Sequence, residues 1–195
     1  MNIAVFCGSS SPKSEKYTTA ARQLGQLIAL GGHTLLYGGS NLGLMGTVSS
    51  ASLEGGGHVV GVIPSFFSEE VILSQPVSEL VRVASMAERK EYLIAHSDAF
   101  IALPGGIGTL DEVFEVLVAN QLGRCSKPMG LLNTQGFFNP QMEMLRHMES
   151  EGLYNLTDAR YLIIDDQPEG LLQMLTSFVP LPIDGPVARR LRTDA

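Results

Sequence analysis

The amino-acid sequence predicts an α/β fold, a three-layer sandwich in which a predominantly parallel sheet of about seven strands has helices on both faces. Two observations lead to this prediction. Short apolar segments alternate with longer segments whose apolar residues recur at helical spacing. Turns rich in glycine or serine follow the apolar segments, as expected where right-handed crossovers connect parallel strands.

The elements of the first half are bounded by glycines and by one capping signal. Gly31-Gly32 ends the first helix, and Gly55-Gly56-Gly57 ends a second helix of small residues. Ser85, with Glu88 three residues later, forms a capping box that predicts a helix start. The expected elements are a strand at 3–7, a helix up to 30, a strand at 34–37, a helix at 47–53, a strand at 58–63, a strand at 80–83 and a helix at 85–95.

The second half continues the same alternation. Residues 98–103 are short, apolar and bounded by turn residues, which is typical of a buried parallel strand. The remaining expected elements are a helix from 110, a strand at 128–132, a helix at 138–148, a strand at 161–164 and a helix at 169–178. Residues 64–78 carry mixed signals and predict a loop or short helix near the site. Residues 180–195 lack periodicity, so we expect one domain over 1–179 followed by a tail.

Composition and charge exclude several classes of protein. The chain has 195 residues, 45% of them hydrophobic, and a formal net charge of −7, which disfavours non-specific nucleic-acid binding. Cys7 and Cys125 have neither a metal-ligand spacing nor a disulfide framework. The N-terminus lacks a basic signal-peptide region, and no apolar stretch reaches membrane-spanning length. We therefore expect a cytoplasmic protein that binds neither nucleic acid nor membrane.

The central feature is the turn at residues 102–112 (A-L-P-G-G-I-G-T-L-D-E), which joins an apolar strand to a helix. Gly105, Gly106 and Gly108 lack Cβ atoms, so a ligand can approach the backbone closely. A helix that begins here presents free N–H groups and a positive dipole end, which favours phosphate. Thr109 and Glu112 also have the spacing of a capping box, so a purely structural role for Glu112 stays open.

Two further loops are expected beside this turn, because ligands bind beyond the carboxyl ends of parallel strands. They are residues 8–11 and 38–46, and with 104–109 they can enclose a nucleotide-sized ligand. Neither loop has the G-x-G-x-x-G spacing of dinucleotide-binding proteins, and no P-loop sequence occurs. Dinucleotide-dependent oxidoreductases and nucleoside triphosphatases are therefore disfavoured.

Arg89 is the other candidate for chemistry. It shares a helix face with Met86 and Leu93, so it lies on the apolar stripe. A buried arginine is costly unless an anion meets it. That anion can be a ligand or a structural carboxylate, and both interpretations remain open. Cys7 ends a buried strand, which favours a core residue over a nucleophile.

At this point the sequence resembles the LOG family of cytokinin riboside 5′-monophosphate phosphoribohydrolases, which are often mislabelled lysine decarboxylases. Residues 104–112 are similar to the family signature P-G-G-x-G-T-x-x-E, and residues 86–90 (M-A-E-R-K) to M-x-x-R-K. Residues 38–46 resemble the second glycine loop, and residues 5–10 match the opening motif. The resemblance covers residues 1–178. One difference is that Asp111 stands where many members have glutamate, which puts its contact with the substrate in doubt.

The resemblance implies a Rossmann-like homodimer that cleaves the N-glycosidic bond of adenine nucleotide monophosphates, giving free base and ribose 5-phosphate without metal or cofactor. Carried over to this chain, Arg89 and Glu112 become the catalytic pair. The implied substrate-binding residues are Gly8, Ser9, Gly39, Gly43, Met45, Lys90, Gly105, Gly106, Ile107, Gly108, Thr109 and Asp111. A carboxylate suits this chemistry, because positive charge builds on the ribose as the base leaves.

One rival function remains open, and a second is disfavoured. A nucleotide-binding or sensing module can use the same phosphate cradle without cleavage. A decarboxylase needs a lysine that forms a Schiff base with pyridoxal phosphate, but the chain has only Lys13, Lys16, Lys90 and Lys127, and Lys90 is better placed for phosphate. A chain of 195 residues also leaves little room for the cofactor and an amino-acid pocket. The sequence does not distinguish adenine from an N6-prenylated adenine, because the pocket walls, for which Phe66, Phe67 and Met45 are candidates, depend on folding.

Overall fold

The computed structural model describes residues 1–67, 77–155 and 160–180. Its strands are β1 (Asn2–Phe6), β2 (Thr34–Tyr37), β3 (His58–Pro64), β4 (Glu79–Val83), β5 (Ala99–Ala102), β6 (Met129–Leu132) and β7 (Leu162–Asp165). Its helices are α1 (Glu15–Leu30), α2 (Gly43–Glu54), α4 (Met86–His96), α5 (Ile107–Gln121), α6 (Asn139–Ser150) and α7 (Pro168–Thr176), with a 3-10 turn, η1 (Thr134–Gly136).

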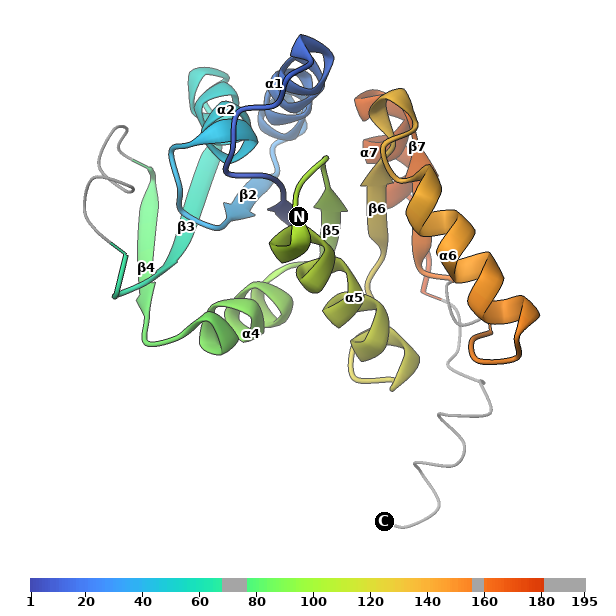
Figure 1. The fold of residues 1–195 in the computed structure, drawn as a ribbon. Helices are drawn as coiled ribbons and strands as arrows, with labels where there is room; N and C mark the ends of the chain where they lie inside the picture. The colour runs from blue at the N-terminus through green and yellow to red at the C-terminus, as the bar shows by residue number, and fades with distance from the viewer. Residues whose placement is uncertain (68–76, 156–159, 181–195) are drawn as a thin grey trace.

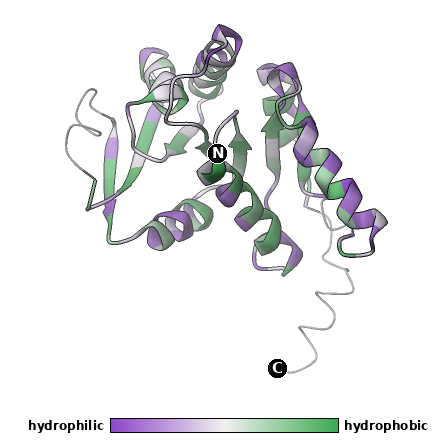
Figure 2. Cartoon of the chain, in the orientation of Figure 1, coloured by the Kyte–Doolittle hydropathy of each residue, from purple (hydrophilic) through white to green (hydrophobic). Residues whose placement is uncertain are grey.

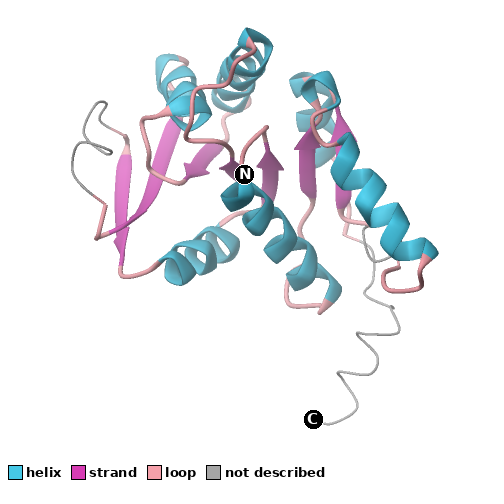
Figure 3. Cartoon of the chain, in the orientation of Figure 1, coloured by secondary structure: helices cyan, strands magenta, loops and turns pink. Residues whose placement is uncertain are grey.

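The strands form one sheet in the order β4-β3-β2-β1-β5-β6-β7, and every pair of neighbours is parallel. Figures 1 and 3 show the sheet between its helices. The predicted three-layer α/β sandwich is therefore confirmed, with all seven strands parallel.

Side chains of β1 alternate between two apolar cores, one on each face of the sheet. Ile3 and Val5 pack with residues of α1, α2 and α7. Ala4 and Phe6 pack with residues of α4 and α5 and with Phe138 before α6. Both faces of each central strand are thus covered, which explains why these strands are apolar throughout rather than alternating with polar residues.

The strand order reverses between β1 and β5, which places two loops side by side at the carboxyl edge of the sheet. The Leu103 N–H donates to the Phe6 carbonyl at 2.9 Å, and the Gly8 N–H donates to the Pro104 carbonyl at 3.1 Å. The Leu44 N–H at the start of α2 donates to the Gly8 carbonyl at 2.9 Å. The loops after β1, β2 and β5 therefore meet at one place, as the sequence predicts.

Element boundaries differ from the predictions at a few ends. Helix α2 begins at Gly43, four residues before the predicted start, so the end of the expected glycine loop is the first helical turn. The cap of α4 is confirmed, because the Ser85 hydroxyl accepts from the Glu88 N–H at 3.1 Å. Glu88 in turn accepts from the N–H of Ala84. Most of the expected loop at 64–78, and the tail after residue 180, lie outside the described residues.

Strand β4 closes one side of the sheet and differs in character from the central strands. Its Glu79 and Arg82 side chains are exposed, and Figure 2 shows hydrophilic colour on this strand where the central strands are hydrophobic. Across the described residues, no helix has the length and apolar character needed to span a membrane.

Candidate functional site

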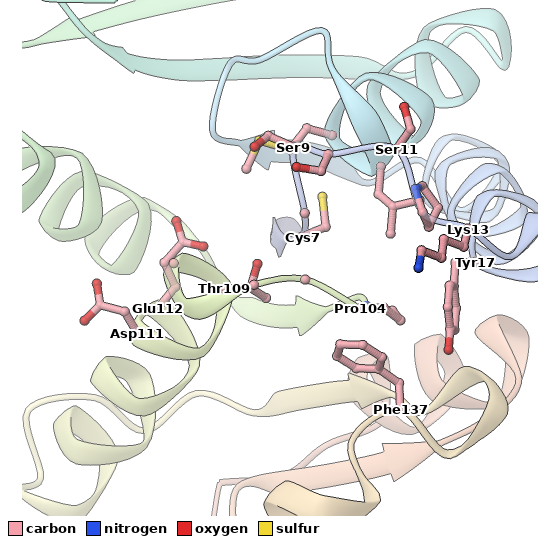
Figure 4. Close-up of a pocket in the computed structure, with 18 of the residues that line it drawn as sticks. Cys7, Ser9, Ser11, Lys13, Tyr17, Pro104, Thr109, Asp111, Glu112 and Phe137 are labelled. Atoms are coloured by element: carbon pink, nitrogen blue, oxygen red, sulfur yellow. The ribbon is translucent and has the colours of Figure 1, made fainter.

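A cavity of about 550 Å³ lies where the loops after β1, β2 and β5 meet. Figure 4 shows Glu112 and Asp111 at one end, Lys13, Tyr17 and Phe137 at the other, and Thr109 between them. The described residues that line the cavity are Cys7, Gly8, Ser9, Ser10, Ser11, Pro12, Lys13, Tyr17, Leu44, Met45, Met86, Arg89, Lys90, Pro104, Gly105, Gly106, Gly108, Thr109, Asp111, Glu112 and Phe137.

The turn between β5 and α5 forms the floor of this cavity. Gly106 is the N-cap of α5, with extended backbone and no side-chain cap, so the first N–H groups of the helix have no capping side chain. A Cβ on Gly105 would press on the Thr109 side chain and lie 2.9 Å from the Gly8 nitrogen, so only glycine fits there. This turn presents backbone donors to the cavity.

The capping-box interpretation of Thr109 and Glu112 is wrong. Helix α5 begins at Ile107, so Thr109 is its third residue rather than its cap. The Glu112 side chain pairs with Arg89 instead of returning to the backbone. Glu112 therefore does not cap the start of α5, and its carboxylate pairs with the Arg89 side chain instead.

Arg89 and Glu112 form a buried ion pair between α4 and α5. The Arg89 Nη2 atom lies 3.1 Å from Glu112 Oε1, and each side chain is less than one tenth exposed. Gly38, the residue directly after β2, leaves room for the Arg89 guanidinium, because a Cβ at this position would collide with it. The burial of Arg89 on the apolar side of its helix agrees with the sequence prediction.

The guanidinium of Arg89 keeps donors that no described carboxylate uses. Its Nη1 lies 3.7 Å from the Met86 sulfur, which is a weak acceptor, and its buried Nε has no hydrogen-bond partner among the described residues. Buried donors without a partner are uncommon in folded proteins, so the unpaired Nε calls for a structural or functional explanation.

Burial raises the pKa of Glu112 from its ordinary value of 4.5 to about 7, against the lowering effect of Arg89. Asp111 and Glu115 raise it further, and Lys90 lowers it. A carboxyl group whose pKa lies near neutrality can exchange a proton at physiological pH. Burial also raises the pKa of the Cys7 thiol, with Glu112 adding to the effect, so Cys7 is a neutral wall residue.

Lys90 lies beside this pair but has carboxylate partners of its own. Its Nζ is 2.9 Å from Asp111 Oδ2 and 2.6 Å from Glu115 Oε2. These bonds raise the pKa of Lys90, so it remains a cation. Lys90 therefore neutralises two carboxylates in this structure, in addition to lining the cavity.

Most of the residues named from the sequence line the cavity together. The exceptions among the described residues are Gly39, Gly43 and Ile107, which are not part of its lining. Phe66 and Phe67, considered as pocket walls, stack on one another at 4.8 Å between ring centroids and also lie outside the lining.

The structure adds apolar and cationic residues that the sequence argument missed. Tyr17 and Phe137 are in edge contact, with ring centroids 5.9 Å apart, and they wall the end that contains Lys13. Phe137 follows β6, far from every glycine loop in sequence, so no local pattern could have assigned it. Lys13 follows the first loop directly, and its position after a serine-rich strand end was an available signal.

Sequence comparisons relate the chain to a known family. Residues 45–175 match the family model described as "Possible lysine decarboxylase". The chain is 41% identical over 187 residues to the cytokinin riboside 5′-monophosphate phosphoribohydrolase LOG5 of Arabidopsis thaliana, covering 96% of this chain and 82% of the relative. It is 43% identical over 179 residues to the LOG enzyme of Oryza sativa subsp. japonica, covering 91% and 74%.

Solved structures with the same fold include proteins described as binding or carrying the molybdenum cofactor. The molybdenum cofactor binding protein of Rippkaea orientalis matches with a TM-score of 0.66 and 28% identity, covering 90% of this chain and 95% of that one. The molybdenum cofactor carrier protein of Chlamydomonas reinhardtii matches with a TM-score of 0.67 and 26% identity, again covering 90% of this chain and 95% of that one.

Proposed function

The chain belongs to the LOG family of cytokinin riboside 5′-monophosphate phosphoribohydrolases, and from this premise we propose that it hydrolyses the N-glycosidic bond of adenine-type nucleoside 5′-monophosphates. The products are the free base and ribose 5-phosphate. The observation that carries the proposal is the buried Arg89–Glu112 pair, which faces the same cavity as the glycine turn at the start of α5.

The spacing along α5 fits a ribose 5-phosphate. Glu112 lies five residues after Ile107, a rise of about 7.5 Å along the helix axis. A phosphate at the N–H groups of Gly106 to Gly108 therefore leaves the anomeric C1′ near the Glu112 carboxylate. Gly8, Ser9 and Met45 line the other side of the same cavity.

The chemistry follows from the charge that develops at the sugar. As the bond from C1′ to the base breaks, positive charge spreads over C1′ and the ring oxygen, and the ionised Glu112 carboxylate stabilises it. Water attacks C1′ and gives up a proton, and the base leaves as the neutral purine after it is protonated. Arg89 holds Glu112 in place, and its remaining donors can bind a substrate oxygen.

The test is release of adenine and ribose 5-phosphate from AMP and from an N6-prenylated AMP by the purified protein. We expect Glu112→Gln to lower kcat by a factor of about 100 or more. Glu115→Gln is the matched control, because it makes the same change one turn along α5 on a residue that pairs with Lys90. Thermal melts of both variants establish that they fold.

A second candidate function is ligand carriage without cleavage, and it is favoured by the structural similarity to a molybdenum cofactor binding protein and a molybdenum cofactor carrier protein. In that case neither AMP nor its prenylated form is cleaved, yet both raise the melting temperature of wild type and of Glu112→Gln. Cleavage by wild type that Glu112→Gln abolishes excludes this candidate.

Decarboxylation fits the site less well than nucleotide hydrolysis. A Schiff base needs a neutral lysine amine, whereas two carboxylates keep Lys90 charged. Lys13 also lines the cavity, but it is exposed and so lacks the desolvation that favours a neutral amine. Lys127 donates to the backbone carbonyls of Ile94 and Ala95, at 2.7 Å and 3.3 Å, and does not line the cavity. An absorbance band from pyridoxal phosphate in the purified protein would contradict this conclusion.

The proposal extends to the form of the protein. Residues 1–179 are proposed to be one catalytic domain that assembles as a homodimer and acts in the cytoplasm without metal or cofactor. Both cysteines are free and buried, which suits a reducing compartment. Light scattering coupled to size-exclusion chromatography measures the assembly, and a mass of one chain would contradict the dimer.

A further inference from the structure

The cavity continues beyond the start of α5, on the side away from Glu112. Figure 4 shows Lys13, Tyr17 and Phe137 at this far end, with Ser9 and Ser11 along one wall. Of these, Lys13 is exposed, Tyr17 is half-buried, and Phe137 is 37% exposed. The proposed function places the phosphate at the start of α5. This end of the cavity then lies beyond the phosphate, on the side away from the ribose and Glu112.

The cations of the cavity differ in whether they are already neutralised. Arg89 pairs with Glu112, and Lys90 pairs with Asp111 and Glu115. Lys13 takes part in none of the ion pairs of the described residues. It is thus the lining cation that can meet a new negative charge without first breaking an ion pair, and a phosphate monoester brings nearly two such charges at neutral pH.

The aromatic wall behind Lys13 is held in place from two sides. The Ser14 hydroxyl donates to Gln135 Oε1 at 2.9 Å, which ties the start of α1 to the turn η1. Gln135 has φ 55°, and it is the one residue other than glycine with positive φ among those described. The Phe138 N–H donates to Asn133 Oδ1 at 2.8 Å, and Phe137 packs against Phe138. Such local strain persists only where the surroundings enforce it, and it is frequent at ligand sites.

We propose that this end of the cavity recognises a terminal 5′-phosphate: Lys13 binds it from the side opposite the α5 amides, and the Tyr17–Phe137 wall excludes a further phosphoryl group. The inference rests on the proposed function and extends it, since it names the residues that select nucleoside monophosphates over nucleosides and over diphosphates. The serine hydroxyls of residues 9–11 supply additional donors to the same oxygens.

The role of Lys13 is tested by titrating the protein with ribose 5-phosphate in a calorimeter. We expect Lys13→Ala to weaken this binding about tenfold, as for loss of one charge-assisted hydrogen bond. The ratio of kcat/KM for AMP to that for adenosine should fall by a similar factor. Lys16→Ala is the control, because Lys16 is also exposed but lies outside the cavity lining. Equal effects of the two substitutions would overturn the role of Lys13.

The role of the wall is tested by comparing ADP with AMP as substrates. Wild type should have a kcat/KM for ADP at least about tenfold below that for AMP, and Phe137→Ala should raise the ADP to AMP ratio about fivefold. Phe66→Ala removes an exposed phenylalanine that lies outside the lining and should leave the ratio as in wild type. An unchanged ratio in a folded Phe137→Ala variant contradicts the wall.

These measurements separate the inference from the proposed function. If AMP is cleaved but ribose 5-phosphate binds equally well to wild type and Lys13→Ala, the function stands and the inference fails. If neither AMP nor N6-prenylated AMP is cleaved but ribose 5-phosphate binding depends on Lys13, the phosphate site stands and the hydrolase proposal fails.

Discussion

Glu112 and Arg89 carry charges that burial disfavours, and each depends on the other for compensation. The guanidinium lies 3.1 Å from the carboxylate, and both side chains are almost inaccessible to solvent. An isolated charge at either position would be costly, whereas the pair together is close to neutral in its effect on stability. The pair is therefore explained better by function than by a gain in folding energy.

Removing Arg89 alone should expose this dependence. Arg89→Met leaves Glu112 buried without its partner, so we expect the free energy of unfolding at pH 8 to fall by about 3 kcal/mol. The loss should be smaller at pH 5, where Glu112 is protonated. The double variant Arg89→Met/Glu112→Gln should regain most of the loss at pH 8. Urea unfolding at both pH values checks this, and equal losses in the single and double variants would argue against it.

The raised pKa of Glu112 gives stability a definite dependence on pH. Between its ordinary value of 4.5 and its folded value of about 7, the folded protein binds this proton more tightly than the unfolded chain does. Ionisation therefore costs stability as pH rises through this window, by up to about 3 kcal/mol. Glu112→Gln lacks this cost.

The expected result is that Glu112→Gln becomes more stable relative to wild type as pH rises from 4.5 to 8. Chemical unfolding at several pH values measures this difference, with Glu91→Gln as the control, because Glu91 is an exposed carboxyl outside the cavity lining. A constant difference over the range would show that Glu112 ionises normally in the folded protein.

At the scale of elements, the turn between β5 and α5 is tightly packed at Gly105. Gly105 is in contact with Thr109 and Gly8, but a Cβ on its neighbour Gly106 would meet no atom within 4 Å. Two adjacent glycines therefore have different reasons to be glycine. Gly105 is required for packing, whereas Gly106 leaves space beside the cavity.

Alanine at these two positions should behave differently. We expect Gly105→Ala to lower the free energy of unfolding by about 2 kcal/mol, because Thr109 and the Gly8 backbone must move. Gly106→Ala should change it by only about 0.5 kcal/mol. Thermal and urea unfolding of both variants test the pair, and similar losses would contradict the close packing seen at Gly105.

Periodicity and glycine placement predicted the type and order of these elements, because buried parallel strands and amphipathic helices leave strong local signals. The start of α5 was less certain, since Thr109-x-x-Glu112 has capping spacing while Gly106 is the true cap. The partner of Lys90 was also missed. Its contacts with Asp111 and Glu115 join two helices, and such pairings depend on how α4 and α5 pack rather than on either sequence alone.

At the scale of the whole molecule, the Arg89–Glu112 end of the site was predictable and the far end was not. Arg89 stood out because it interrupts the apolar stripe of its helix, and Glu112 because it completes the motif at residues 104–112. Tyr17 and Phe137 follow ordinary apolar patterns and become a wall only when the loop after β6 is brought to the start of α1. Motifs of one segment can be read from sequence, but surfaces shared by distant segments require the fold.

Every described residue that lines the cavity lies between Cys7 and Phe137. A chain that ends at Pro180 should therefore fold and cleave AMP with a kcat/KM within about twofold of the full chain, a range that corresponds to about 0.4 kcal/mol. Steady-state kinetics and a thermal melt of the shortened protein are the measurement. A large loss of activity with an unchanged melt would give residues 181–195 a part in the reaction.

The open sheet has consequences for how copies of this chain can associate. Strand β4 stands at one edge of the sheet, and its Glu79 and Arg82 side chains are exposed. Charges on an edge strand hinder the backbone pairing through which sheets of neighbouring molecules fuse. Association by extending the sheet is therefore disfavoured at this edge, and unlimited strand-by-strand growth into fibres is discouraged.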